Sequence, residues 1–312
     1  MTTAPEVVEP ARRPRSSASA SPARALARGL ALTVLFLAIL VVVWEGAKAL
    51  GGDPWRFTSP SGEEVTYRPP FKWQIVSDLS LPHVWEIADA LAAPVQRQQA
   101  QSLAGFLVGA AIHTGQEAAL GFLFGALLGL ALAAVFVHSK LAERAFMPYI
   151  VASQTIPILA LAPLIAFAFG NGLVGIVIVA SYLTFFPVTI ARIRGLTSPD
   201  PRAIELMRSC AASRWTIFWK LRMPASLPYL FAALKIAATA SIVGAIVGEG
   251  NPGGSQFGLG RAILNFNEQY ASGPEKLWAA MLASALLGLT FFGAIRIAEL
   301  LALRGRPAEA AG

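Results

Sequence analysis

Charged residues and cysteine are scarce in this chain of 312 residues. Only 14% of the residues are Asp, Glu, Lys or Arg, whereas soluble domains average about 25%. The single cysteine, Cys210, excludes an intrachain disulfide framework, and we expect it to be a small helical residue rather than a reactive thiol. Together with a hydrophobic content of 55% and a mean hydropathy of +0.58, these shortages indicate that most of the chain is surrounded by lipid.

Several catalytic motifs are also absent. The chain has no G-x-x-x-x-G-K-[S/T] loop and no H-E-x-x-H, G-x-S-x-G or C-x-x-C sequence. Without the first motif it has no P-loop to cradle nucleotide phosphates, so it is not itself an ATPase. His113 and Glu117 are spaced to pair on one helix face, but two ligands do not make a metal site. We expect no enzymatic activity, cofactor or metal in this chain.

What the chain does contain is a series of long apolar runs. A bilayer core requires about 20 apolar residues per helix, and continuous runs of this kind favour helices over barrel strands. The sequence therefore predicts an all-α, polytopic membrane protein with six transmembrane helices. The runs are 29–44, 118–137, 145–169, 172–191, 225–248 and 277–295. A further apolar run, 102–112, predicts a lengthened outer segment before the second span.

Basic residues are concentrated in alternate connections between these runs. The net charge is +7, and Lys and Arg gather before the first span, after the second, between the fourth and fifth, and after the sixth. The positive-inside rule then places both termini in the cytoplasm. A nucleic-acid-binding surface would instead need a basic patch on a polar domain.

The composition suggests three parts. Residues 1–25 are rich in Ala, Ser, Pro and Arg and predict a disordered cytoplasmic tail. Residues 26–304 form the transmembrane domain, and 305–312 a second cytoplasmic tail. The outer loop, 51–101, is long, and 83–91 within it predicts a short helix at the membrane surface. Its Trp residues fit interfacial anchors, and docking of an outer protein is the alternative.

One polar segment carries a specific spacing. It runs from Glu205 to Pro228 and reads ELMRSCAASRWTIFWKLRMPASLP. This spacing resembles the "EAA" loop of binding-protein-dependent ABC importer permeases, with Glu205 at its start, Ala211 at the glycine position and Pro224 at the final proline. Leu206 and Met207 replace the two alanines of the family pattern.

Other segments extend the resemblance over about half of the chain. They are Gln154-Thr155-Ile156-Pro157, Ala162-Pro163-Leu164, Phe169-Gly170-Asn171-Gly172, Ala211-Ala212-Ser213-Arg214-Trp215 and Gly258-Leu259-Gly260. They are similar to the importer branch for nitrate, sulfonates, taurine and pyrimidine-type compounds. The resemblance implies the type I ABC importer permease fold, in a bacterial cytoplasmic (inner) membrane. It also implies a small solute, either a vitamin-like heterocycle such as a pyrimidine or riboflavin, or an anion such as nitrate, sulfonate or taurine.

The resemblance further implies partner proteins. These are two ATP-binding cassette subunits that hold ATP and Mg, a second permease chain (the same chain or a close paralogue), and an extracytoplasmic solute-binding protein. In the family, the cytoplasmic loop, here 192–224, docks on the ATPase. The residues implied in this coupling are Glu205, Leu206, Met207, Cys210, Ala211, Ala212, Ser213, Arg214 and Pro224.

The residues of this loop support the same interpretation. Ser198 is a plausible N-cap for a helix over 199–213, with prolines and Asp200 in the first turn. The helix would be amphipathic and too short to be stable alone. Docking on a partner protein would explain how such a short helix is stable, and a helix lying on lipid headgroups is the alternative.

Polar residues and prolines inside the spans indicate where a translocation path would run. Pro157, Pro163 and Pro187 each remove a backbone hydrogen bond, which predicts kinks that either expose carbonyls to a path or merely adjust packing. The candidate path residues are Gln154, Thr155, Ser181, Thr184, Thr239, Ser241 and Glu249. Serine and threonine also serve helix packing, and Glu249 has three alternatives: a binding-protein contact, a gate or a solvated residue.

Charges inside the spans separate this hypothesis from a competing one. An ion-gradient-driven secondary transporter would require paired ionisable residues near the middle of the bilayer. Lys235 is the only charge well inside a span, and we expect it to face the cytoplasm in a structural role. One departure from the family is that its Thr-Leu-x-x-Arg pattern is replaced here by His113-Thr114-Gly115-Gln116-Glu117, an acid where relatives have Arg.

Overall fold

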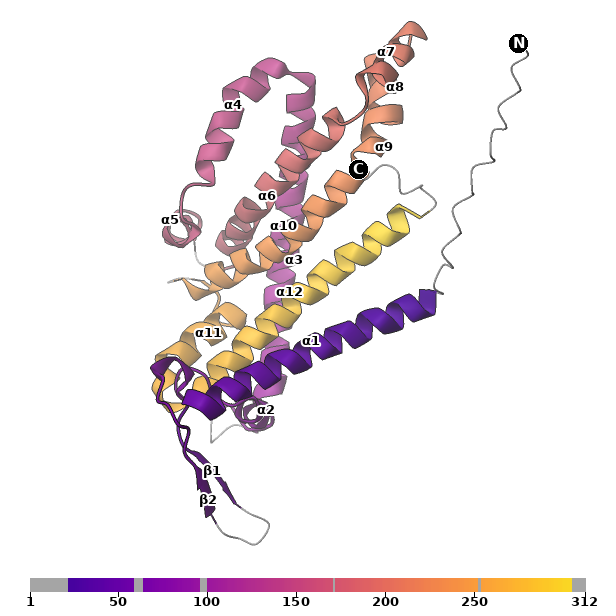
Figure 1. The fold of residues 1–312 in the computed structure, drawn as a ribbon. Helices are drawn as coiled ribbons and strands as arrows, with labels where there is room; N and C mark the ends of the chain where they lie inside the picture. The colour runs from indigo at the N-terminus through magenta and orange to yellow at the C-terminus, as the bar shows by residue number, and fades with distance from the viewer. Residues whose placement is uncertain (1–21, 59–63, 96–99, 171, 252–253, 305–312) are drawn as a thin grey trace, which may run out of the picture. The chain divides into compact units, whose positions relative to one another are not determined.

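The computed structural model describes residues 22–58, 64–95, 100–170, 172–251 and 254–304 (Figure 1). The chain divides into two compact units, residues 1–77 and 78–312. Each unit is described by itself.

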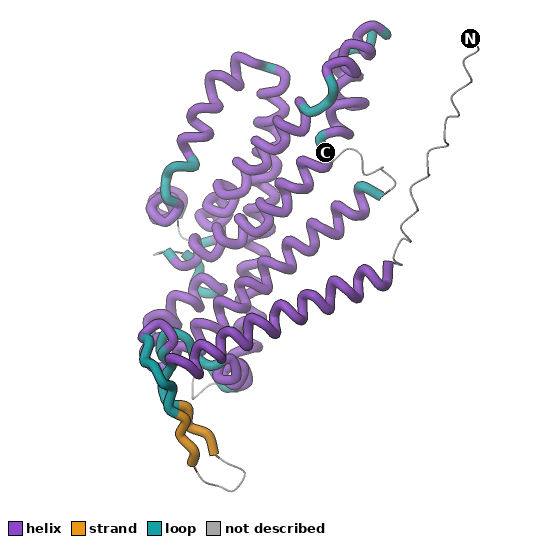
Figure 2. Tube along the Cα trace, viewed as in Figure 1, coloured by secondary structure: helices purple, strands orange, loops and turns teal. Residues whose placement is uncertain are grey.

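The first unit contains one long apolar helix and a small hairpin. Helix α1 is Pro22–Gly51, strands β1 and β2 are Trp55–Thr58 and Glu64–Tyr67, and a 3₁₀ turn, η1, is Gln74–Val76. The two strands pair antiparallel, with Trp55 opposite Tyr67 (Figure 2). The Tyr67 hydroxyl donates to the Ala49 carbonyl at 3.1 Å, which fastens the hairpin to the end of α1.

Two predictions for this region need correction. Helix α1 begins at Pro22, inside the segment predicted as a tail; the rest of that segment, 1–21, and the predicted tail 305–312 lie outside the described residues. The outer loop contains a hairpin that we did not predict. Its strands are rich in aromatic and β-branched residues, which favour extended backbone, but each is only four residues long and gives little periodic signal.

In the described part of the second unit, every named element is a helix or a helical turn. Its elements are α2 (Val84–Ala92), α3 (Leu103–His138), α4 (Lys140–Ser153), α5 (Ile158–Phe169), α6 (Leu173–Thr197), α7 (Pro201–Ser209), α8 (Arg214–Ile217), a π-helical turn η2 (Phe218–Arg222), α9 (Met223–Ala225), α10 (Leu227–Gly250), α11 (Leu259–Glu268), η3 (Tyr270–Ser272) and α12 (Pro274–Ala302). Helix α2 confirms the predicted short helix, and the Glu86 side chain accepts from the His83 backbone N–H at 2.8 Å at its start.

Five described helices are long and apolar enough to cross a membrane. They are α1, α3, α6, α10 and α12. A sixth candidate is the pair α4 and α5, which is bent by 102° at a short break. The all-α class and up to six spans agree with the prediction.

The prediction of one continuous third span over 145–169 is wrong. The helix breaks between Ser153 and Ile158, and Pro157 lies in the break rather than inside a helix. Pro157 has no N–H to continue the ladder, and a residue before proline is disfavoured in the helical region. The Tyr182 hydroxyl donates to the freed Ser153 carbonyl. Pro163 and Pro187 do lie inside helices, as predicted.

The apolar run 102–112 forms the first part of α3, so this helix is lengthened beyond the predicted span 118–137. The Ser102 side chain caps the helix by accepting from the Gly105 N–H at 3.2 Å. At 36 residues, α3 is about 54 Å long, which exceeds the hydrocarbon core of a bilayer.

Glycine allows α3, α6 and α10 to pack closely. Gly121, Gly125 and Gly129 lie one turn apart on α3 and face α6. A Cβ atom added at Gly125 would lie 2.6 Å from the Ser181 carbonyl oxygen, and one at Gly244 of α10 would lie 2.6 Å from the Ala180 Cα. Such small-residue contacts are how membrane helices gain packing without a hydrophobic driving force. Helix α6 is thereby held between α3 and α10.

An ion pair adds a second link, between α10 and α12. The Lys235 ammonium lies 2.9 Å from Glu299 Oε2 and 3.2 Å from Oε1, and Arg296 Nη1 lies 2.5 Å from the same Oε2. Lys235 is therefore paired, with an acid that lies beyond the predicted sixth span, 277–295. The structural role predicted for Lys235 agrees with this contact.

Candidate functional site

The segment with the family spacing forms a helical excursion between α6 and α10. We call Pro201–Ala225, which comprises α7, α8, η2 and α9, the coupling segment. It follows the end of α6, and α7 lies at one extremity of the second unit (Figure 1).

Helix α7 starts later than predicted. Its N-cap is Asp200, whose Oδ1 accepts from the Arg202 N–H at 2.8 Å. The Ser198 hydroxyl instead donates to the Gly195 carbonyl at 2.9 Å, at the end of α6. Asp200, and not Ser198, is the N-cap because its carboxylate both accepts a backbone N–H and complements the positive end of the helix dipole. The helix ends at Ser209, so it is shorter than the predicted 199–213.

The end of α7 explains the glycine in the family motif. Ala211 has φ +58°, and it is the only non-glycine residue with positive φ in the described part of the chain. Its N–H donates to Arg208 O at 2.9 Å, and the Ala212 N–H donates to Met207 O at 3.0 Å. These two bonds form a Schellman motif, which places a left-handed residue just after the helix and favours glycine there. Ala211 adopts that conformation with a Cβ atom.

After this turn the chain re-enters the bundle. Ser213 caps α8 by accepting from the Thr216 N–H at 3.1 Å, and η2 follows as a π-helical turn. Arg192 of α6 donates through Nη1 to Ser226 Oγ at 2.5 Å. This contact ties the exit of the coupling segment to α6.

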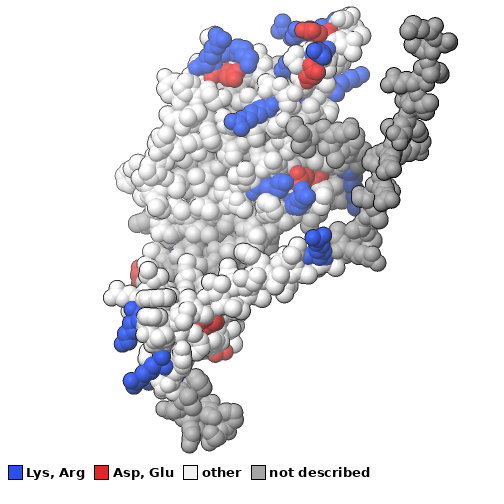
Figure 3. Space-filling view, viewed as in Figure 1, with Lys and Arg blue, Asp and Glu red and all other residues white. Residues whose placement is uncertain are grey.

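Helix α7 itself has almost no packing of its own. None of its nine residues, all described, is buried. Leu206 is 67% exposed, and Glu205, Arg208 and Cys210 are also exposed. Figure 3 shows charged side chains gathered at this end of the second unit. Exposed Leu206 beside exposed charges is the composition of a docking face.

The structure spreads the candidate path residues over several helices. Gln154 and Thr155 lie in the break between α4 and α5, and their donors bond Ser153 Oγ at 3.4 Å and Ala152 O at 2.8 Å. The other hydroxyl candidates bond backbone carbonyls: Ser181 to Gly121, Thr184 to Ala180, Thr239 to Ile236 and Ser241 to Ala238. Thr184 and Ser241 are fully buried within the chain. Their assignment to a path stays a prediction.

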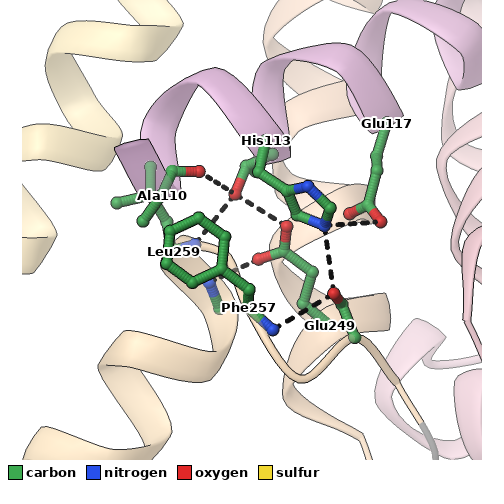
Figure 4. Close-up of polar contacts among 9 residues, drawn as sticks. Ala110, His113, Glu117, Glu249, Phe257 and Leu259 are labelled. Carbon is green, nitrogen blue, oxygen red and sulfur yellow. Dashed lines mark hydrogen bonds and ion pairs between the residues drawn. The ribbon is translucent and has the colours of Figure 1, made fainter. Parts of the chain in front are cut away.

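Glu249 lies in a buried polar cluster instead of on the surface (Figure 4). Its carboxylate is 2.7 Å from the Thr114 hydroxyl and accepts from the Gly260 N–H at 2.6 Å. The Glu117 carboxyl lies near Glu249 in the same cluster, and the His113 ring is 3.3 Å from Glu117. Burial excludes the solvated and surface-contact alternatives for Glu249.

This cluster links three helices that sequence reasoning treated separately. The predicted pairing of His113 with Glu117 is confirmed, but the approach of Glu249 from α10 was not foreseen. The signal available was the acid at position 117, near the position of Arg in the family pattern that the sequence resembles. Arg192 and Glu299 were also missed as buried residues, since each reads in the sequence as an ordinary charge near the end of a span.

Comparison with known proteins decides the family. The model of the binding-protein-dependent transport system inner membrane component matches residues 121–300. The chain belongs to this family. It is 30% identical over 265 residues to the formylaminopyrimidine transport permease protein ThiX of Halalkalibacterium halodurans, a match that covers 85% of this chain and 92% of that protein. It is 34% identical over 167 residues to the riboflavin transport system permease protein RibX of Chloroflexus aurantiacus, covering 54% and 61%.

A solved structure shows the same fold. A chain of the MetNI methionine ABC transporter, in an inward-facing conformation, matches with a TM-score of 0.56 at 17% identity, covering 64% of this chain and 97% of that one. The fold is that of a type I ABC importer permease. As a member of its family, the protein is the non-enzymatic membrane component of an importer that works with an ATPase and a solute-binding protein.

The family also settles the competing hypothesis. We expected paired ionisable residues near the middle of the bilayer to mark an ion-driven secondary transporter, and Lys235 does pair with Glu299, which lies near the end of α12. The protein is nevertheless an ABC permease. In this chain, pairing across α10 and α12 is therefore compatible with a structural role.

Proposed function

We propose that the coupling segment docks on a separate ATP-binding subunit and that it lies on the cytoplasmic side, together with both termini. The observation that carries this proposal is α7, which has a capped start, a Schellman end and no buried residue. A nine-residue helix does not hold its shape in water without tertiary contacts. A partner that covers Leu206 and Glu205 would supply those contacts. The basic residues of 192–224 support the cytoplasmic placement.

In the complete importer, two permease chains would each present one coupling segment to a pair of ATPase subunits, with a solute-binding protein on the other side. Closure of the ATPase pair on ATP would draw the two segments together and rock the helices from inward-facing to outward-facing. This is alternating access by rigid-body motion. The α6 core would transmit the motion, because close glycine contacts join it to α3 and α10.

The first experiment is purification of the tagged chain in mild detergent from its own host, followed by native mass spectrometry. We expect a P-loop ATPase in equal numbers with the permease, and two copies of each. Glu205→Lys should remove the ATPase. Glu268→Lys is the matched control, since Glu268 is equally an exposed acid but lies at the end of α11. Recovery of the ATPase with Glu205→Lys would refute the docking.

For the solute, we propose a small pyrimidine-like or related nitrogen heterocycle. The support comes from two relatives, one a formylaminopyrimidine permease and the other a riboflavin permease. The test is uptake of labelled formylaminopyrimidine, riboflavin and taurine by cells with and without the gene. Loss of only the heterocycle uptake is expected. Loss of taurine uptake alone would place the protein with the anion importers.

The break between α4 and α5 is the proposed lining of the translocation path. Gln154 and Thr155 lie at this break, where backbone groups leave the helical ladder, and such backbone is tolerated in a membrane only against protein or water. Single cysteines placed at Thr155 and, as a control, at Val243 in a Cys210→Ser background would test this. Thr155→Cys should react with a water-soluble thiol reagent only while the transporter hydrolyses ATP. Absence of labelling at both positions would contradict the assignment of Thr155 to the path.

A further inference from the structure

Arg192 is a buried cation without a described counter-charge. It lies near the end of α6, is 4% exposed, and donates to the Ser226 hydroxyl and to the Met223 sulfur. Both of these partners are neutral. Among the residues that the structure describes, no Asp or Glu forms an ion pair with it. A buried charge is expensive unless an opposite charge accompanies it, so the site calls for an anion from outside the described residues.

The space beside Arg192 is large and apolar. Arg192 lines a cavity of about 580 Å³ between α3, the end of α6 and η2. The remaining walls are Leu130, Ala134, Val135, His138, Leu196, Trp215, Phe218, Trp219 and Met223. Trp215 and Trp219 are 63% and 50% exposed. Exposed Trp beside apolar residues is typical of the boundary between a membrane and water, so the cavity suits a hydrocarbon chain.

A second cavity, with a more polar lining, adjoins the first. It measures about 210 Å³, and Arg208, Arg214 and Arg222 line it together with Val137, Ile204 and Ile217. The two cavities share His138 and Phe218, whose rings lie 5.0 Å apart. An occupant that spans both would therefore need an apolar part and an anionic part joined at short distance.

We propose that these adjoining cavities bind one anionic phospholipid. An acyl chain fills the apolar cavity, and the phosphate lies between Arg192 and the three arginines of the smaller cavity. Basic pockets beside transmembrane helices are suited to anionic headgroups. A soluble phosphate or an acidic side chain of the ATPase would leave the apolar cavity empty. The inference rests on the cytoplasmic placement of the coupling segment proposed above.

The lipid would have a mechanical consequence. Its chain contacts α3 and α6, and its phosphate contacts Arg208 and Arg214 of the coupling segment. It would thereby join the membrane bundle to the segment that meets the ATPase. The lipid composition of the membrane then affects how firmly the coupling segment is held.

The test uses the assembled permease–ATPase complex in nanodiscs of phosphatidylcholine, with or without phosphatidylglycerol. Native mass spectrometry after stepwise delipidation should show phosphatidylglycerol retained on the complex. Arg192→Gln should lower its occupancy about tenfold, the loss expected from one charge-assisted hydrogen bond. Arg144→Gln is the matched control, because Arg144 is an exposed cation in α4 and lines neither cavity. It should retain the lipid.

A second variant covers the case in which Arg192→Gln does not assemble. Ala134→Leu leaves every charge in place but fills part of the apolar cavity, and it should also reduce phosphatidylglycerol retention. Equal retention of phosphatidylcholine, displacement by inorganic phosphate, or unchanged retention in both variants would overturn the proposal. The ATPase in the same sample reports separately on the docking proposed above, so a failure of one proposal is visible without the other.

Discussion

The core helices and the coupling segment differ in where their contacts come from. In α3, α6 and α10, glycines bring the backbones so close that a Cβ atom at Gly125 or Gly244 would overlap its neighbour. In α7, which is described throughout, no residue is buried, and only its caps hold the ends. The core helices pack on one another within the chain, whereas we propose that α7 gains its contacts from another chain. Substitutions in the two regions should therefore affect different measurements, stability in the first and ATPase association in the second.

The largest effect on stability is expected from Lys235→Met. This change leaves Glu299 with Arg296 as its counter-charge, so the cost should approach but not exceed the roughly 3 kcal/mol of a buried charge left without a partner. The melting temperature of the purified protein should fall, while ATPase association should persist in the folded fraction. The double variant Lys235→Met, Glu299→Leu should recover much of the loss. An unchanged melting temperature in the single variant would show that the pair does not join α10 to α12.

The next largest effect is expected from Gly125→Ala. The new methyl group would meet the Ser181 carbonyl and Thr184, and overpacking of this kind costs about 1–3 kcal/mol. Gly288→Ala is the matched control, because a Cβ atom there meets nothing within 4 Å. The control should gain stability, since alanine is the better helix former. Thermal unfolding of both in detergent checks the prediction, and equal shifts would contradict it.

Leu206→Asp should leave stability unchanged and weaken the ATPase complex. An exposed apolar residue at an interface centre contributes about 1–2 kcal/mol, which corresponds to roughly tenfold in affinity. Titration of the ATPase against the reconstituted permease measures this. Arg202→Gln, in the same helix and also exposed, is the control. A lower melting temperature for Leu206→Asp would show that Leu206 contributes to the stability of the permease itself, which would contradict the prediction.

The smallest effect is expected from Ala211→Gly. Glycine adopts the left-handed conformation without the steric penalty that alanine carries, a difference of about 1 kcal/mol. The coupling segment should become more protected in amide hydrogen exchange, above all at the 211 and 212 N–H groups that close the Schellman motif. Ala212→Gly should give no such gain. Faster hydrogen exchange in Ala211→Gly would mean that the left-handed conformation of residue 211 does not determine the stability of the end of α7.

The signals for the candidate site in the sequence are local. Spacing alone singled out Glu205, Ala211 and Pro224, whose role in coupling stays a prediction, and the φ of Ala211 gives the physical reason for a glycine at that position of the motif. The helix start was missed by two residues because Ser198 and Asp200 are both good caps and only their contacts separate them. The hairpin was missed because its strands are too short for a period to show.

The sequence by itself determined the apolar spans, their helical class and the coupling segment, because a lipid environment obliges each span to satisfy its own backbone and to be apolar along its length. Only the tertiary structure decided that Glu249 meets Glu117, that Lys235 meets Glu299, and that Arg192 is buried without a described acid. Each of these depends on a residue from a helix far along the chain. The rotation and depth of one helix against another are set by glycine contacts, and no single span encodes them.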